Sequence, residues 1–324
     1  MAQIDLKNLQ IKEVSNNILL VKQINPPFYF SCSDGLILLP EKERNQNLIV
    51  LDLNIEPKYV DLIIEKYGKP SYYINTHGHM DHIAHVHEWE KYGAQILGPK
   101  GEIENLLNLN YFYRCYEFSE GVSFSSIEKF AKVNGYNHCQ NISSFQPGEV
   151  LELEDLELQT IPLTGHSKSQ VGFLLKEDKI FHISCMGFDI SKPDDNGFGP
   201  WYGFKQCSIE QYIKDIDLAE KLYKEKADCL TSSHSYIVKK PDLLPFIYMR
   251  DKIKQNQLIV ENALKQIDTN LCLEDKVQEL LKMDLFFPKM KMNGFLKEIY
   301  TFWEYWIIKN SLIFQKKDFN SGKK

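Results

Sequence analysis

The sequence predicts a mixed α/β protein with a helical C-terminal extension, and three features support this fold class. Short apolar runs bounded by Asn, Asp, Gly and Pro, typical of strands, alternate with helical patterns, and the order of strands followed by a helix occurs twice before residue 240. A polar cluster at residues 76–82 lies where a strand gives way to a helix, the position at which α/β proteins place their chemistry. From residue 241 onward only helical patterns remain.

In the first half of the chain, strands surround one clear helix. Apolar runs at residues 18–22, 35–40 and 48–53 predict strands, and residues 57–67 predict a helix that stops at Gly68. The pattern continues with a strand, a helix and a further strand, at residues 71–75, 83–92 and 95–99. We therefore expect the polar cluster at the junction between the fourth strand and its helix.

An aromatic-rich segment follows at residues 101–147, which we interpret as an inserted helical pair that buries its own aromatics or as a lid or dimer surface. Strands at 149–160, 170–175 and 179–184, a helix at 208–225 and a strand at 228–232 follow. Helices with apolar residues at i, i+3 and i+4 then fill the C-terminus. We divide the chain into residues 1–240, with the insertion at 101–147, and a helical subdomain at 241–324.

Composition limits the function classes. A chain of 324 residues is long enough to bury a full core without disulfide or metal staples. Its content of 43% hydrophobic and 25% charged residues is ordinary for a globular protein. A net charge of −6 and a pI near 5.9 argue against binding nucleic acid through overall charge. No signal-peptide pattern opens the chain and no apolar run of about 18 residues occurs, so we expect a cytoplasmic protein without a membrane partner. Seven cysteines without a C-x-x-C pair predict reduced, mostly buried thiols.

Five of the nine histidines lie between residues 77 and 87, and they include the pattern H-x-H-x-D-H. His77 and His79 are two apart in extended chain and point the same way, so they can bind one metal ion. Asp81 and His82, where the chain turns into a helix, can face a second ion. Two such ions can hold a hydroxide at neutral pH and stabilise a developing oxyanion. The pattern therefore predicts a dinuclear hydrolytic site.

Residues 76–82 resemble the signature of the metallo-β-lactamase superfamily, and three later segments resemble the rest of its pattern in the same order. These segments carry His166, Asp189 and His234, each after an apolar strand. The resemblance covers residues 15–240 and implies an αββα sandwich with metals at one edge. The helical tail also resembles the winged-helix-like extension of some members. The implied ligands are His77, His79 and His166 for one ion, Asp81, His82 and His234 for the other, and Asp189 as the bridge.

One departure from the family pattern concerns the bridge. Many relatives place the bridging aspartate directly after a small residue, and some that share the run at residues 199–203 carry Asp-x-Asp. Here Gly187 occupies the first position of that second pattern, and Asp189 stands alone two residues later. Residues two apart in a strand face the same side, so Asp189 can substitute; the alternative is a weaker or empty second metal position. Trp201, Tyr202 and Lys168 are candidate substrate contacts, with a packed loop anchor as the alternative for the two aromatics.

The remaining histidines receive no ligand role. We expect His85 and His87 to be neighbours of the ligands or surface residues, and His182 to be a core residue with its polar atoms satisfied. His138 lies in the insertion and receives no assignment.

The expected function is a metal-dependent hydrolase in which a metal-bound hydroxide attacks an acyl substrate such as a thioester, lactone or ester. Asp81 would orient the hydroxide and carry its proton, and the cofactors would be two divalent ions, Zn²⁺ first and Fe or Mn as alternatives. The resemblance leaves open a phosphodiesterase or nuclease, a mononuclear iron dioxygenase of the persulfide type held by His77, His166 and Asp189, and a non-catalytic metal-binding protein. We expect a small-molecule partner and leave a homodimer open.

Overall fold

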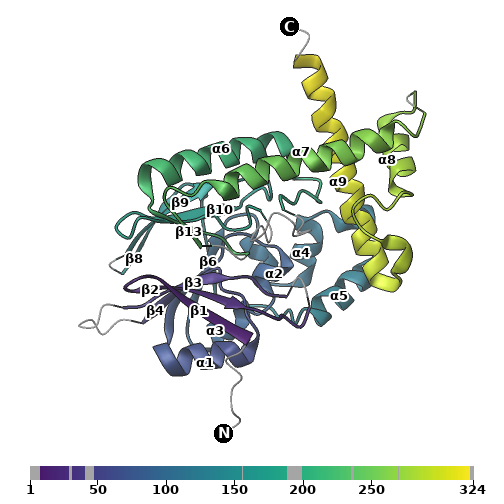
Figure 1. Cartoon of the computed structure of the whole chain (residues 1–324). Helices are drawn as coiled ribbons and strands as arrows, with labels where there is room; N and C mark the ends of the chain where they lie inside the picture. Colours follow the sequence, from purple (N-terminus) through teal and green to yellow (C-terminus); the bar gives the residue numbers. More distant parts are fainter. Residues whose placement is uncertain are drawn as a thin grey trace.

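Two β-sheets packed face to face, with helices on their outer sides, form the centre of the protein (Figure 1). The computed structural model describes residues 8–28, 31–40, 47–154, 156–187, 199–234, 237–268 and 270–321, with side chains as far as residue 316. This arrangement confirms the predicted αββα sandwich with helices at the C-terminus. None of the helices in the described part of the chain combines the length and apolar character needed to cross a membrane.

The first sheet has seven strands in chain order. They are β1 (Leu9–Ser15), β2 (Ile18–Gln23), β3 (Gly35–Leu38), β4 (Leu48–Leu51), β5 (Pro70–Ile74), β6 (Gln95–Pro99) and β7 (Ile142–Phe145). Neighbours pair antiparallel as far as β4, and β4 to β7 run parallel. The carboxyl ends of β4 and β5 therefore lie at the same edge of the sheet.

The second sheet has six strands in the order β13-β12-β11-β10-β9-β8. They are β8 (Val150–Leu153), β9 (Leu156–Pro162), β10 (Val171–Leu175), β11 (Ile180–His182), β12 (Cys229–Thr231) and β13 (Ile237–Lys239). β11 and β12 pair in parallel, and the other neighbours in this sheet pair antiparallel. Because β10 lies antiparallel between β9 and β11, β9 points the same way as β11 and β12. The carboxyl ends of β9, β11 and β12 thus share one edge.

Helices cover the outer faces of both sheets. Beside the first sheet lie α1 (Pro57–Tyr67) and α3 (Val86–Lys91), and beside the second lie α6 (Ile209–Lys226) and α7 (Leu244–Leu264) (Figure 1). Gly68 ends α1 with a φ of 100°, a backbone conformation that glycine adopts without a steric penalty. The predicted helix stop at this residue is confirmed.

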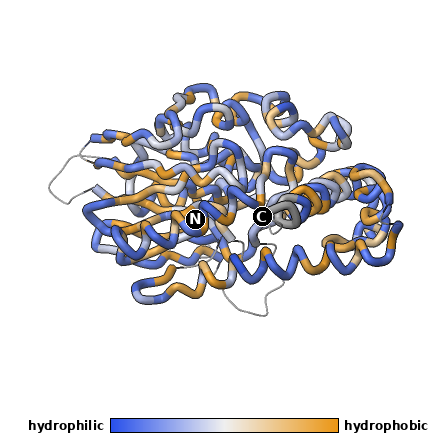
Figure 2. The backbone as a smooth tube through the Cα atoms, turned by 90° about the horizontal axis from the view of Figure 1, so that it is seen from above, coloured by the Kyte–Doolittle hydropathy of each residue, from blue (hydrophilic) through white to orange (hydrophobic). Residues whose placement is uncertain are grey.

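The inter-sheet core explains why several strands read as continuous apolar runs. In β4, Ile49 and Leu51 belong to the core between the sheets, whereas Leu48 and Val50 belong to the core that packs against the outer helices. A strand buried on both faces needs apolar residues at every position. In Figure 2, which colours the backbone by hydropathy, hydrophobic stretches of the chain are separated by hydrophilic ones.

The insertion and the C-terminal helices pack against each other. The insertion contains η2 (Ile103–Leu106), α4 (Leu109–Cys115), η3 (Phe118–Glu120) and α5 (Phe124–Val133), and the C-terminus adds α8 (Leu273–Leu281), η4 (Lys289–Lys291) and α9 (Gly294–Ser321). The ring centroids of Phe118 and Phe302 are 5.1 Å apart, and those of Phe130 and Trp303 are 5.9 Å apart. The helical pair predicted for the insertion is present, and α9 helps to bury its aromatics. The division at residue 240 stays a prediction.

The helix predicted over residues 83–92 is wrong in one respect, because it forms two short helices, α2 (Met80–Ile83) and α3. Side chains from neighbouring loops form hydrogen bonds with the backbone groups that would pair with each other in a single continuous helix. The His85 N–H donates to Asn54 Oδ1 at 2.7 Å, and the His82 carbonyl accepts from Asn75 Nδ2 at 3.1 Å. The periodicity does not show this break, because both asparagines lie outside the helical segment and Asn54 is 31 residues from His85.

Candidate metal centre

Five loops converge where the carboxyl ends of the strands of both sheets meet. The loop after β4 carries Asp52, and the loop after β5 carries His77, His79 and the start of α2. The loops after β9, β11 and β12 carry, respectively, His166, Cys185 and His234. The Val171 N–H donates to the Thr76 carbonyl at 3.1 Å and joins the two sheets at this edge.

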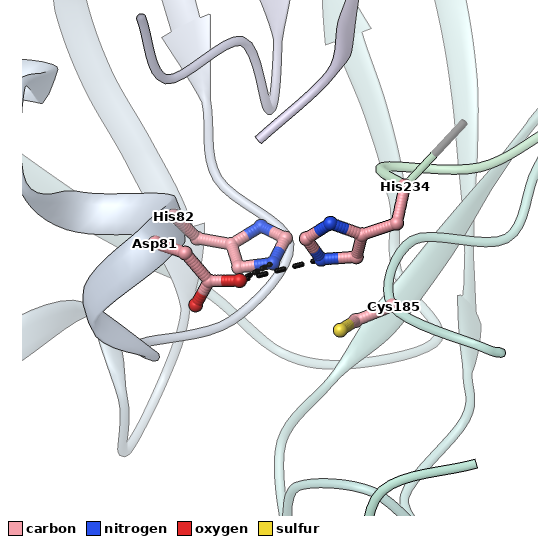
Figure 3. Close-up of side chains that lie close together, drawn as sticks. All are labelled: Asp81, His82, Cys185 and His234. Atoms are coloured by element: carbon pink, nitrogen blue, oxygen red, sulfur yellow. Dashed lines mark ion pairs between the residues drawn. The ribbon is translucent and has the colours of Figure 1, made fainter. Parts of the chain in front are cut away.

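One group of possible ligands consists of Asp81, His82, Cys185 and His234 (Figure 3). One ligand atom from each lies within 4.8 Å of those of the others. Asp81 Oδ2 is 3.5 Å from His82 Nε2 and 3.3 Å from His234 Nε2. Two ligands of one tetrahedral zinc ion lie about 3.3 Å apart. These separations therefore match ligands that share an ion.

A second group consists of His77, His166 and the same Cys185, again with ligand atoms within 4.8 Å of one another. His79 is not a member of this group but lies beside it, with its Nδ1 3.0 Å from His166 Nε2. The structure thus brings together all six described residues of the implied ligand set, three on each side. Cys185 belongs to both groups and lies between them.

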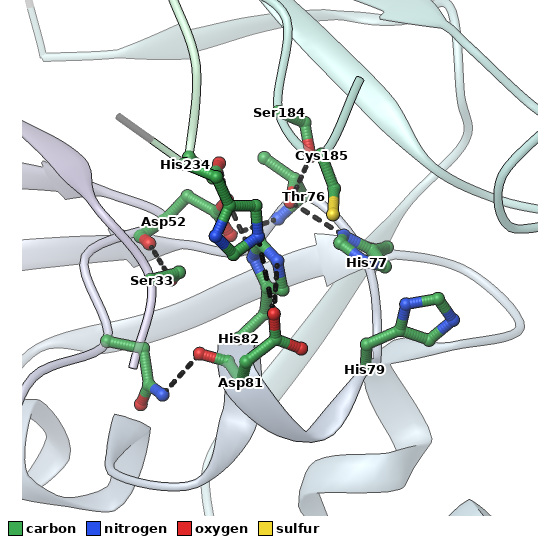
Figure 4. A network of polar contacts seen from close by, with 12 residues as sticks. Ser33, Asp52, Thr76, His77, His79, Asp81, His82, Ser184, Cys185 and His234 are labelled. Atoms are coloured by element: carbon green, nitrogen blue, oxygen red, sulfur yellow. Dashed lines mark hydrogen bonds and ion pairs between the residues drawn. The ribbon is translucent and has the colours of Figure 1, made fainter. Parts of the chain in front are cut away.

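Hydrogen bonds at one ring nitrogen orient three of the histidines, of which Figure 4 shows His77 and His82 with their partners. His82 Nδ1 is 2.8 Å from Asp52 Oδ2, His166 Nδ1 is 2.8 Å from the Trp201 carbonyl, and His77 Nδ1 is 3.0 Å from Thr76 Oγ1. Metal-binding histidines usually have such a partner, which holds the ring and leaves the other nitrogen to the metal. Among the described residues, His77 Nε2 and His82 Nε2 are buried without a hydrogen-bond partner. The donor set therefore fits a metal ion.

Asp52 is the buried carboxylate that ties this network together. Its oxygens accept hydrogen bonds from Ser233 Oγ at 2.6 Å and from the Thr76 N–H at 3.1 Å, besides the contact with His82. Burial raises the pKa of Asp52, but the His82 and His182 rings outweigh burial and hold the pKa below its ordinary value. Asp52 has a φ of 54°, a left-handed conformation that residues other than glycine adopt mainly where function or packing imposes it.

The electrostatics keep His77, His79 and His166 neutral. Burial, followed by the neighbouring histidines, lowers the pKa of His77 and His79 well below 6.5, and burial lowers the pKa of His166 to about 3. For Asp81, burial raises the pKa, but His82 and His234 outweigh it and lower the pKa. Neutral imidazole and ionised carboxylate are the forms that bind metals, so these side chains are ready to bind without losing protons.

Acid should destabilise the metal-free protein. His77, His79 and His166 have lowered pKa values when folded, so the stability they confer is complete above about pH 6.5 and falls as pH decreases below that value. For His166, with a pKa of about 3, the loss between pH 6.5 and 5 is about 2 kcal/mol. His82 acts in the opposite direction, because Asp52 and Asp81 outweigh burial and raise its pKa.

We expect urea midpoints, followed by tryptophan fluorescence in chelator, to fall steadily from pH 7 to pH 5. A His166→Gln variant should show a shallower dependence on pH. A midpoint that does not change over this range would contradict the assigned neutral state of the buried histidines.

The structure leaves one expected ligand untested and adds one candidate ligand that the sequence analysis did not assign. Asp189, expected to bridge the ions, lies outside the described residues. Cys185, which we expected to be one of the buried reduced thiols, lies between the two groups. All seven cysteines are free, and five of them are buried. The available signal was that Cys185 directly follows the strand after which a bridging ligand was expected, two residues before Gly187.

The candidate substrate contacts have different environments. The Trp201 ring centroid is 5.6 Å from that of His79 and 5.8 Å from that of His166, so Trp201 borders the cluster. Tyr202 is buried, and its hydroxyl lies 3.4 Å from Gln257 Nε2 of α7, a contact typical of a packed loop anchor. Lys168 is exposed.

The other histidines lie outside the two groups. His182 is fully buried between Thr231 Oγ1 at 3.0 Å and Ser233 Oγ at 3.1 Å, which confirms a satisfied core residue. His85 and His87 are buried rather than on the surface, and His87 Nε2 contacts Glu88 at 2.7 Å. His138 is exposed.

Solved structures with the same architecture share little sequence with this chain. A β-lactamase domain protein from Burkholderia ambifaria aligns with a TM-score of 0.62 and 11% identity over 95% of this chain and 89% of its own. A metallo-beta-lactamase family protein from Thermus thermophilus aligns at 0.58 and 15% over 93% of each chain. A metallo-beta-lactamase from Pontibacter korlensis aligns at 0.53 and 14% over 76% of this chain and 99% of its own. No family model and no curated protein matches the sequence.

The chain has the metallo-β-lactamase fold. The alignments with the Burkholderia and Thermus proteins cover more than nine tenths of this chain. Identities of 11% to 15% concern the fold alone. Within this metallo-β-lactamase fold, the two ligand groups occupy the edge at which the strands of both sheets end.

Proposed function

We propose that this protein is a metal-dependent hydrolase that acts on small acyl substrates such as thioesters, lactones or esters. The observation that carries the proposal is the meeting of two groups of buried ligand atoms around Cys185. Nitrogen, carboxylate and thiolate ligands together favour zinc, with iron and manganese as alternatives. Two groups favour two ions.

The side chains around the proposed metal ion have different roles. A divalent ion at this site would supply a Lewis acid and bring the pKa of a bound water close to neutrality. His82 and His166 present Nε2 because Asp52 and the Trp201 carbonyl hold their Nδ1 atoms. Asp81 is ionised, since its pKa is lowered, and its carboxylate can accept a hydrogen bond from the attacking water and take up its proton. Trp201 borders the site beside His79 and His166 and can exclude bulk water.

The group of Asp81, His82, Cys185 and His234 weighs against the mononuclear iron dioxygenase. A single ion held by His77, His166 and Asp189 would leave this buried second group without a role. A dinuclear centre uses both groups. We favour a small-molecule substrate over nucleic acid because the net charge of −6 disfavours binding of a polyanion.

The deciding experiment joins metal analysis to a substrate panel. Purified protein should contain about two zinc ions per chain and hydrolyse at least one thioester, lactone or simple ester faster than a phosphodiester. Chelator should remove the activity, and zinc should restore it. Less than one metal per chain together with no hydrolysis would favour the non-catalytic alternative, and preferential phosphodiester cleavage would favour the nuclease-like one.

A further inference from the structure

A buried carboxylate from the insertion lies directly beneath the metal-binding loops. Glu102 has no exposed surface, and its side chain accepts four hydrogen bonds. Oε2 accepts from the Gly78 N–H and from the Tyr116 hydroxyl, both at 2.9 Å. Oε1 accepts from Ser167 Oγ at 2.7 Å and from the Ser169 N–H at 2.8 Å. Each oxygen thus serves one backbone donor and one hydroxyl.

Three of these donors, Gly78, Ser167 and Ser169, belong to the loops that carry three histidines. Gly78 lies between His77 and His79 in the loop after β5, and Ser167 directly follows His166 in the loop after β9. The first loop extends from the first sheet and the second loop from the second sheet. The two oxygens of one side chain therefore hold together two loops that share no strand pairing.

The backbone around Glu102 fits the motif loop closely. The Gly78 carbonyl accepts from Asn105 Nδ2 at 3.2 Å, so residues of the same short segment hold both polar groups of Gly78. A Cβ on Gly78 would lie 2.8 Å from the Glu102 carbonyl oxygen and 2.4 Å from Asn105 Nδ2. Only glycine permits this approach, so the loop position is determined by contact with the insertion.

We propose that Glu102 is a positioning residue that holds His77, His79 and His166 in one geometry for binding a metal ion. The inference rests on the proposed metal centre and deepens it, because it gives the start of the 101–147 insertion a role in that centre. Partners that orient metal ligands typically change metal affinity by about 10- to 100-fold when they are removed. Glu102 orients three ligands through their backbone and would act on all of them together.

Replacing Glu102 with glutamine makes a demanding test because it changes few atoms. The amide nitrogen would face two donors at whichever oxygen it replaced. A hydroxyl can turn away, but the N–H of Gly78 or of Ser169 cannot, so one loop must move or lose its bond. Glu304 offers a matched control. It is a fully buried carboxylate of α9 that contacts Lys289 and accepts from the Phe286 N–H at 3.1 Å.

The experiment measures zinc affinity by chelator competition, together with the absorption spectrum of the cobalt-substituted protein. We expect Glu102→Gln to weaken zinc binding by about 10- to 100-fold and to alter the cobalt bands. Glu304→Gln should lower thermal stability but keep wild-type affinity and spectrum. Wild-type affinity and spectrum in Glu102→Gln would overturn the inference, whereas a wild-type protein that binds no metal would overturn the proposed function instead.

Two milder variants keep the test decisive if Glu102→Gln does not fold. Tyr116→Phe and Ser167→Ala each remove one hydroxyl donor and leave both backbone donors in place. We expect each to weaken zinc binding severalfold and the double variant to weaken it further. Unchanged affinity in the double variant would contradict the role of Glu102.

Discussion

Replacing Asp81 with asparagine should lower kcat/KM for the best substrate by about 10²- to 10⁴-fold, the range for loss of a group that transfers protons. Asparagine keeps the size of the side chain but removes the negative charge that faces His82 and His234. It also removes the site at which a proton can be held. Metal content should fall on the side of His82 and His234, so both turnover and stoichiometry should be measured on the same preparation.

A matched control for Asp81 is available on the next helix. Glu88 of α3 is also buried and contacts His87 at 2.7 Å, but it belongs to neither ligand group. Glu88→Gln should change thermal stability while leaving metal content and kcat/KM close to wild type. Equal losses of activity in the two variants would mean that the effect of Asp81→Asn is general destabilisation, and full activity in Asp81→Asn would exclude Asp81 from the reaction.

Replacing Cys185 with alanine should have the second largest effect. Its sulfur lies among the ligand atoms of both groups, so its loss should weaken metal binding on both sides. We expect a loss in affinity of at least about 10- to 100-fold, the range known for partners one step further from a metal. In the cobalt-substituted protein, the near-ultraviolet band that a thiolate ligand produces should disappear.

Cys229→Ala is the corresponding control. Cys229 is a buried thiol of the neighbouring strand β12 and belongs to the core between the sheets. The Cys229→Ala variant should be less stable than the wild type but keep the cobalt band and the metal content.

The variant Asp189→Ala distinguishes the two candidate bridging ligands, Asp189 and Cys185. If Asp189→Ala alone removes metal and turnover while Cys185→Ala keeps both, the shared ligand is Asp189 and Cys185 is a neighbour.

Much of the fold could be predicted because it depends on local patterns. The continuous apolar run of β4 and the apolar face of α1 that ends at Gly68 both carry their own signal. Three strands of the structure, β1, β7 and β13, were not predicted, and β8 and β9 were predicted as one strand over residues 149–160. β7 has two exposed serines at its centre, so its place in the sheet depends on pairing with β6 and not on an apolar pattern. The break between α2 and α3 was missed for a similar reason, since Asn54 and Asn75 cause it from outside the helix.

In the candidate site, too, some features follow from local sequence and others depend on tertiary contacts. The sequence by itself determined which residues have the chemistry of ligands in the motif at residues 77–82, because imidazole and carboxylate groups spaced along a few residues carry that chemistry wherever the chain folds. The order of the later histidines followed from the resemblance. Only the tertiary structure decided which other side chains meet them. Cys185, Asp52 and Glu102 come from three separate loops, and their roles arise because strands of two sheets end at one edge. Distances between such groups depend on strand pairing and packing, which no local pattern records.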